Sequence, residues 1–259
     1  MSSQASALQA KPPRSAFGEL LRSELLVAWR VPLGLLIGVA VPVLVLLIFG
    51  AVPGMNKTEK SLDGLTFFDV YFPVLVAFVS AVLSLISLPT HLATYREQGI
   101  LRRMSTTPVP PTSMLAAQVV INLALTAIAL GIIVVVGMAG FGLGAPKQAG
   151  GFILALALTV ASMFAIGLWI AAIARSAAIA GGIGQLFLFP LLFFAGLWIP
   201  RELMTPVLRD ISDWFPLGAS VQALQSSMQG VFPSAESLLV MAAWALAFGA
   251  LAVRFFRWE

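Results

Sequence analysis

The feature that most constrains the fold is a series of apolar runs of about 20 residues, separated by short polar segments. Such a run is long enough to cross the hydrocarbon core of a bilayer as an α-helix. In lipid the backbone must satisfy its own hydrogen bonds, which a helix does within one segment. The sequence therefore predicts an all-α membrane protein with six spans, at about residues 31–52, 67–88, 114–140, 151–174, 177–199 and 234–253.

Composition supports the membrane class. The chain has 259 residues, of which 59% are hydrophobic and 10% are charged, whereas soluble domains carry about 25% charged residues. It contains no cysteine, which excludes disulfides and thiolate metal sites. The net charge of +4 does not indicate nucleic-acid binding, because the charged residues lie at the ends of the apolar runs, where membrane topology places them.

The segments outside the spans have their own patterns. Residues 1–13 are small and polar and predict a disordered tail, so that residues 14–259 form one transmembrane domain. Residues 15–30 combine charged and apolar side chains at helical spacing, which predicts an amphipathic helix in the headgroup plane. Residues 200–233 are too polar to span, and their apolar stripes predict two short interfacial or re-entrant helices that meet near Pro216.

The distribution of cations predicts the orientation. Six spans place both termini on one side of the membrane, and cytoplasmic segments are enriched in Lys and Arg. Termini inside the cell put 10 of the 15 Lys and Arg residues in the cytoplasm, namely Lys11, Arg14, Arg22, Arg30, Arg96, Arg102, Arg103, Arg175, Arg254 and Arg257. We therefore predict a cell-membrane protein with cytoplasmic termini and a cytoplasmic segment 95–111.

Groups suited to catalysis are scarce within the predicted spans. Their only charged side chains are Asp69 and Glu236, each near a span end, and proton relays or intramembrane proteases need polar groups at depth. His91 is predicted to be interfacial and Asn122 to form a hydrogen bond between helices, with a contact to cargo as the alternative for each. No lysine follows a glycine, so the chain lacks the Gly-Lys pair of an ATP-binding P-loop.

The fifth span combines glycines and prolines. Gly181, Gly182 and Gly184 predict close packing between spans, or alternatively a dimer seam or a flexible point. Farther along the same span, Pro190, Gly196 and Pro200 predict a broken helix. Discontinuous helices are frequent in transporters.

The order of these segments resembles the permease subunits of ABC-2 type exporters. The run Arg-Glu-Gln-Gly-Ile-Leu-Arg-Arg-Met at 96–104 is similar to the family's cytoplasmic Arg-Glu-x-Gly-x-Leu segment, and Thr107-Pro108 to the Thr-Pro that follows it. Residues 194–200 are similar to its apolar-Gly-x-x-x-Pro pattern, although Ala195 stands where serine is common. Residues 214–217 are similar to its aromatic-x-Pro-Leu pattern. The drug- and antibiotic-resistance branch is the most similar.

The resemblance implies partners. It implies a homodimer, or a pair with a similar subunit, and two separate ATPase chains that bind ATP and Mg, with no cofactor in this chain. It also implies that one cytoplasmic segment forms a coupling helix that docks on the ATPase, comprising Arg96, Glu97, Gly99, Ile100, Leu101, Arg102, Arg103 and Met104. The arginines can donate charge-assisted hydrogen bonds there. The alternative is a solvated loop held at anionic lipid headgroups.

The leading functional hypothesis is the membrane subunit of an ATP-driven exporter for a lipophilic or amphipathic compound, such as a drug, an antibiotic or a lipid-like molecule. Spans rich in Phe, Leu and Met suit an apolar cargo. The alternatives are export of a polysaccharide or lipid-linked glycan, and a membrane scaffold or assembly protein without transport. An intramembrane enzyme is disfavoured because catalytic groups are missing.

Overall fold

The computed structural model describes residues 40, 43–48, 51–52, 66–99, 111–141 and 144–255. These residues contain helices and no strand, which confirms the all-α class. The predicted tail, the helix predicted at 15–30 and most of the first predicted span lie outside them. Five helical stretches are long and apolar enough to cross a membrane, namely Phe67–Glu97, Ala116–Gly140, Ala149–Ile173, Ala177–Phe194 and Ala235–Phe255.

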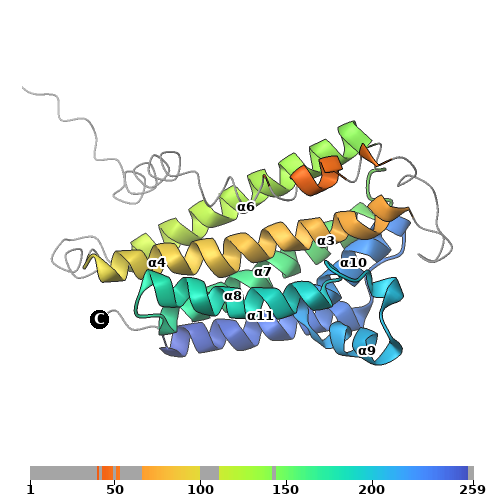
Figure 1. Ribbon diagram of the computed structural model, residues 1–259. Helices are drawn as coiled ribbons and strands as arrows, with labels where there is room; N and C mark the ends of the chain where they lie inside the picture. Colours follow the sequence, from red (N-terminus) through yellow and green to blue (C-terminus); the bar gives the residue numbers. More distant parts are fainter. Residues whose placement is uncertain are drawn as a thin grey trace, which may run out of the picture.

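The long helices lie side by side in one bundle (Figure 1). They are the continuous α3 (Phe67–Val82), η2 (Leu83–Ser87) and α4 (Leu88–Glu97), followed by α6 (Pro111–Phe141), α7 (Ala149–Ile173), α8 (Ala177–Phe194) and α11 (Ala235–Phe255). Three shorter elements connect α8 to α11: η3 (Arg201–Leu203), α9 (Pro206–Trp214) and α10 (Pro216–Gln229). Helices α9 and α10 lie at the opposite end of the bundle from the C-terminal end of α4 (Figure 1).

The continuous helix α3–η2–α4 is the centre of the bundle. Of its most apolar 18-residue window 78% is buried, against 17% for α11. On one side of it, Leu75 and Val79 pack with Ala155 of α7, Leu224 of α10 and Met241 of α11. Any motion of this helix must therefore displace the helices packed around it, because protein interiors are close-packed.

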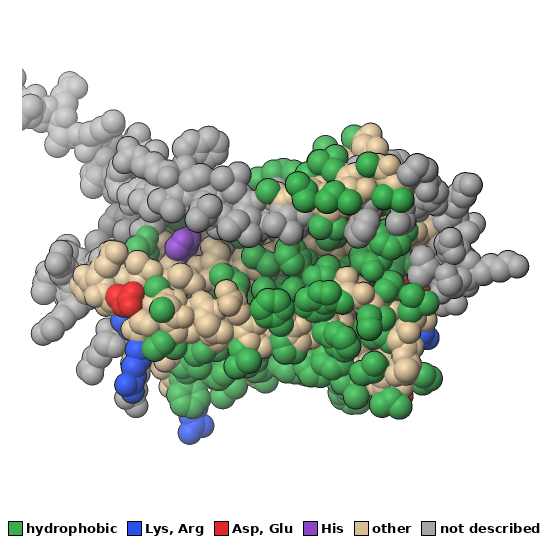
Figure 2. Space-filling view, in the orientation of Figure 1, with side chains coloured by type: hydrophobic (Ala, Val, Ile, Leu, Met, Phe, Trp, Pro, Cys, Tyr) green, Lys and Arg blue, Asp and Glu red, His purple; other side chains and the backbone are tan. Residues whose placement is uncertain are grey.

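The outer faces of the bundle are apolar. Leu186 on α8 is 71% exposed, and Leu246 and Val253 on α11 are 75% and 81% exposed. Figure 2 shows hydrophobic side chains across the middle of the molecule and charged ones at its two ends. A surface of this kind suits the hydrocarbon core of a bilayer, with the charges in the headgroup regions.

The second span differs from its predicted end at Leu88, because the helix continues through Pro89 to Glu97. In a regular α-helix the ring of Pro89 would clash with the carbonyl group four residues earlier, that of Leu85. Residues Leu83–Ser87 form a π-helical turn instead, in which the Leu88 N–H bonds to the Leu83 carbonyl. This wider turn surrounds the carbonyl that would clash, so the proline is accommodated without ending the span.

The segment predicted to hold two short helices contains α9 and α10. Each has a proline in its first turn, Pro206 and Pro216, where a missing N–H leaves no bond unmade. Helix α10 ends at Gln229, and Gly230, with a φ of +98°, forms its left-handed C-cap. It contacts α3, α7 and α11, so this polar helix is enclosed by the candidate spans.

Candidate functional site

The C-terminal end of α4 is fixed to two other helices. Arg96 Nη1 donates to the carbonyl oxygens of Ala171 and Ala174, at 3.1 and 2.8 Å. The last carbonyls of a helix lack intrahelical partners and carry partial negative charge, so a guanidinium binds there favourably. The Tyr95 hydroxyl accepts a 3.2 Å hydrogen bond from Gln118 Nε2 of α6. The end of α4 is thus joined to both α6 and α7.

This end carries the start of the segment predicted to dock on an ATPase. Glu97 is exposed, and Gly99 leaves the helix with a φ of +65°, which favours glycine. Arg96 was predicted to contact the ATPase, whereas the structure shows it forming hydrogen bonds to α7 of the same chain. The sequence did not predict this contact within the chain. The remaining predicted docking residues lie outside the described residues, namely Ile100, Leu101, Arg102, Arg103 and Met104.

The π turn is contacted by glycines from two neighbouring helices. A Cβ atom at Gly167 of α7 would lie 2.0 Å from the Ser84 carbonyl oxygen, and one at Gly184 of α8 would lie 2.1 Å from that of Leu85. Both values are far below a normal contact, so only glycine permits these approaches. Three helices therefore meet at the π turn with almost no space between their backbones.

The three glycines predicted in the fifth span have different surroundings. Gly184 packs on the π turn, as described above. A Cβ atom at Gly181 would lie 3.9 Å from Thr90 Oγ1, an ordinary contact, and one at Gly182 would have no neighbour within 4 Å among the described residues. Of the three, only Gly184 makes a contact with the described helices that is too close for any residue but glycine. Gly182 is exposed on the α8 surface.

The fifth span is interrupted after Pro190, not at it. Helix α8 runs through Pro190 and ends at Phe194, short of the predicted end at Ile199. Gly196 then adopts a φ of +90°, and Pro200 precedes η3. Membrane helices tolerate an internal proline when neighbouring groups compensate for the missing bond. The interruption is therefore the turn from Gly196 to Pro200.

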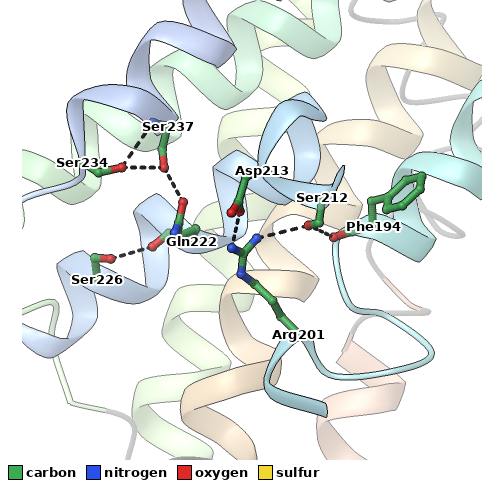
Figure 3. A network of polar contacts seen from close by, with 8 residues as sticks. All are labelled: Phe194, Arg201, Ser212, Asp213, Gln222, Ser226, Ser234 and Ser237. Carbon is green, nitrogen blue, oxygen red and sulfur yellow. Dashed lines mark hydrogen bonds and ion pairs between the residues drawn. The ribbon is translucent and has the colours of Figure 1, made fainter. Parts of the chain in front are cut away.

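An ion pair between a buried arginine and a partly buried aspartate connects this turn to α9. Arg201 is 9% exposed and pairs with Asp213, and its Nη1 donates to Ser212 Oγ at 3.2 Å. Ser212 Oγ in turn donates to the Phe194 carbonyl at the end of α8, at 2.7 Å (Figure 3). Arg201 and Asp213 are 12 residues apart and belong to no common motif, so the sequence did not predict this pairing.

A polar cavity of about 310 Å³ lies next to the ion pair. Besides Arg201, it is lined by Glu202, Arg209, Gln222, Gln225, Ser226 and Gln229. Helix α11 contributes indirectly, because Ser237 Oγ donates to Gln222 Oε1 at 2.6 Å (Figure 3). Every lining side chain is polar, although the chain as a whole is 59% hydrophobic. These residues form no motif in the sequence and were not predicted as a site.

Residues 15–228 match the protein family described as ABC-2 type transporter. This match covers most of the chain. The protein belongs to the ABC-2 type transporter family. No curated protein is significantly similar to it. Family membership and the apolar helices identify a multi-pass membrane protein, the transmembrane permease component of an ABC transporter. The family also implies an ATPase partner.

The permease carries a large apolar groove between α6 and α7. Its volume is about 890 Å³, and its walls include Leu123, Leu130, Ile153 and Phe164. The single hydroxyl among the lining side chains, that of Thr126, donates to the carbonyl of Asn122 in its own helix at 2.7 Å. The groove therefore offers almost no free hydrogen-bonding group. It suits an apolar molecule or the apolar part of one.

Two other predicted residues of the permease lie near α4 and α6. His91 is exposed. Asn122 is 2% exposed, and its Nδ2 donates to the Gln118 carbonyl of the same helix at 2.9 Å. Among the described residues Asn122 does not make the predicted bond between helices; Gln118 makes one instead, to Tyr95. Within the described part of the chain, no group of three His, Cys, Asp or Glu residues could hold a metal ion.

Proposed function

We propose that the permease exports a lipophilic or amphipathic compound, such as a drug, an antibiotic or a lipid-like molecule. The observation that carries this proposal is the chemistry of α6, α7 and α8. These three helices contain no Asp, Glu, Lys or Arg, and the groove between α6 and α7 is apolar. A bare ion would find no compensating charge along them, whereas an apolar cargo exchanges lipid contacts for similar contacts with the protein.

In this proposal the transporter contains two copies of the permease and two ATPase chains, which bind ATP and Mg. It lies in the cell membrane with its termini in the cytoplasm. Residues 96–104 form the contact with the ATPase. Because Arg96 joins α4 to the end of α7, a displacement of this segment on ATP binding moves two spans together. The same continuous helix reaches the π turn, where α7 and α8 pack most closely.

Affinity purification from native membranes tests the composition of the transporter. We expect a tagged permease to co-purify with a protein that carries a P-loop and hydrolyses ATP. Purification without any P-loop protein would contradict the proposal and favour the scaffold alternative. As a control, the same membranes are processed with a tagged membrane protein of unrelated fold, which must not retain the ATPase.

Reconstitution of the purified complex in proteoliposomes tests transport. We expect ATP to drive movement of a lipophilic dye or a fluorescent lipid analogue away from the ATPase side, and no movement of a labelled inorganic ion. ATP-driven movement of a water-soluble polysaccharide, with no response from the lipophilic probes, would assign the glycan alternative instead.

A further inference from the structure

The polar cavity beside Arg201 is not explained by the apolar cargo path. It lies on η3, α9 and α10, at the opposite end of the bundle from the α4 end that we assign to the ATPase (Figure 1). Under the proposed orientation, on which this inference rests, the cavity lies at the outer face. Its volume of about 310 Å³ is at the lower limit of small-molecule sites, which run from about 300 to 1,000 Å³.

The hydrogen bonds inside the cavity wall leave both donors and acceptors available. Gln225 Nε2 donates to Glu202 Oε1 at 2.7 Å, which leaves the Gln225 amide oxygen as an acceptor. Gln222 Oε1 accepts from Ser237, which leaves the Gln222 amide nitrogen as a donor. A ligand that fits this wall must therefore both donate and accept hydrogen bonds.

Two buried atoms of the wall have no hydrogen-bond partner in the part of the chain that the structure describes. They are Glu202 Oε2, an acceptor, and Arg209 Nε, a donor. The Arg209 Nη2 atom is already bound to the Glu202 carbonyl at 2.9 Å. Buried polar atoms without a partner are rare in folded proteins, and they are usually explained by a bound ligand, a bound water or local strain. A hydrogen-bonding ligand in the cavity is one way to supply the missing partners.

The charges of the cavity balance. Asp213 neutralises Arg201 within the ion pair, and the remaining lining charges, those of Glu202 and Arg209, are opposite in sign. A ligand with a net negative or positive charge would therefore gain little electrostatic energy on binding. A hydroxyl group donates and accepts at one atom, so a neutral group with several hydroxyls matches the wall at more points than an ion does.

We propose that this cavity binds the neutral, hydroxyl-rich head of an amphipathic cargo, while the apolar spans accommodate its tail. Saturation-transfer NMR on the full permease in lipid nanodiscs tests this, with methyl β-glucoside as the probe and empty nanodiscs as the blank. We expect saturable binding. Glu202→Gln should raise the dissociation constant about tenfold, the effect of one hydrogen bond to a charged group.

Glu236→Gln is the matched control. Glu236 is exposed at the start of α11 and does not line the cavity, so its variant should bind like the wild type. If Glu202→Gln fails to fold, Gln229→Leu at the exposed rim should still weaken binding several-fold. No glucoside signal above the blank would overturn the proposal. So would an unchanged dissociation constant in the cavity variants, or saturable binding of glycine betaine without binding of the glucoside.

Binding is measured without ATP or ATPase, which separates this proposal from the proposed function. Export of a lipophilic dye that persists while glucoside binding is absent refutes the cavity assignment alone. Glucoside binding that persists while no ATPase co-purifies refutes the exporter alone.

Discussion

The contact between α8 and the π turn predicts opposite effects for the same substitution at two nearby glycines. Gly184→Ala would place a Cβ atom 2.1 Å from the Leu85 carbonyl oxygen and 3.1 Å from Ile86 Cδ1. The first neighbour is backbone inside a packed helix, so it cannot move alone, and α8 must shift away. Gly182→Ala would place the same methyl group where nothing in the described part of the chain lies within 4 Å.

The expected magnitudes follow from these contacts. Overpacking a closed interior lowers the free energy of unfolding by about 1–3 kcal/mol. A clash with a backbone carbonyl at this distance is expected to lie at the upper end of that range. Replacing a helical glycine with alanine recovers at most about 1 kcal/mol through helix propensity. Gly184→Ala should therefore lower the free energy of unfolding by about 2 kcal/mol, and Gly182→Ala should raise it by up to about 1 kcal/mol. The two variants differ by about 3 kcal/mol, roughly a hundredfold in the folding equilibrium.

Denaturant unfolding in mixed micelles, followed by circular dichroism, measures this difference. Gly167→Ala provides a second test from the α7 side, because its methyl group would meet the Ser84 carbonyl oxygen at 2.0 Å. It should be destabilised like Gly184→Ala. Equal stability of the Gly184→Ala and Gly182→Ala variants would refute the argument that glycine is required at the π turn.

Three further changes test other parts of the permease. Asp213→Asn should lower the free energy of unfolding by about 3 kcal/mol, because it removes the partner of a buried guanidinium; a chemical-denaturation midpoint equal to that of the wild type would contradict this. Glu97→Ala should leave the permease in the membrane but uncouple ATP hydrolysis from export, and unchanged transport in proteoliposomes would exclude a coupling role for this exposed carboxylate. Gly182→Leu should reduce the dimer fraction on a native gel if the open face of α8 is the dimer seam, whereas wild-type migration would exclude that seam.

Several features of the permease follow from its sequence alone. Apolar runs of bilayer length must be helical, because lipid offers no partner for backbone N–H and C=O groups. That constraint is local to each run, so the positions of the spans after the first can be predicted without knowing the fold. The motifs at 96–104, 194–200 and 214–217 sufficed for the family resemblance, because their order along the chain can be compared without coordinates.

The tertiary structure decided what depends on neighbouring helices. Pro89 predicted a helix end, yet the π turn accommodates it, and the close contacts of Gly167 and Gly184 belong to the same junction. The pairing of Arg201 with Asp213 and the polar cavity beside it arise where η3, α9 and α10 fold together. Local patterns report which face of a helix is apolar; they do not report which backbone lies against it. The sequence therefore determined a helical ABC-2 permease, and only the packing revealed the junction and the cavity.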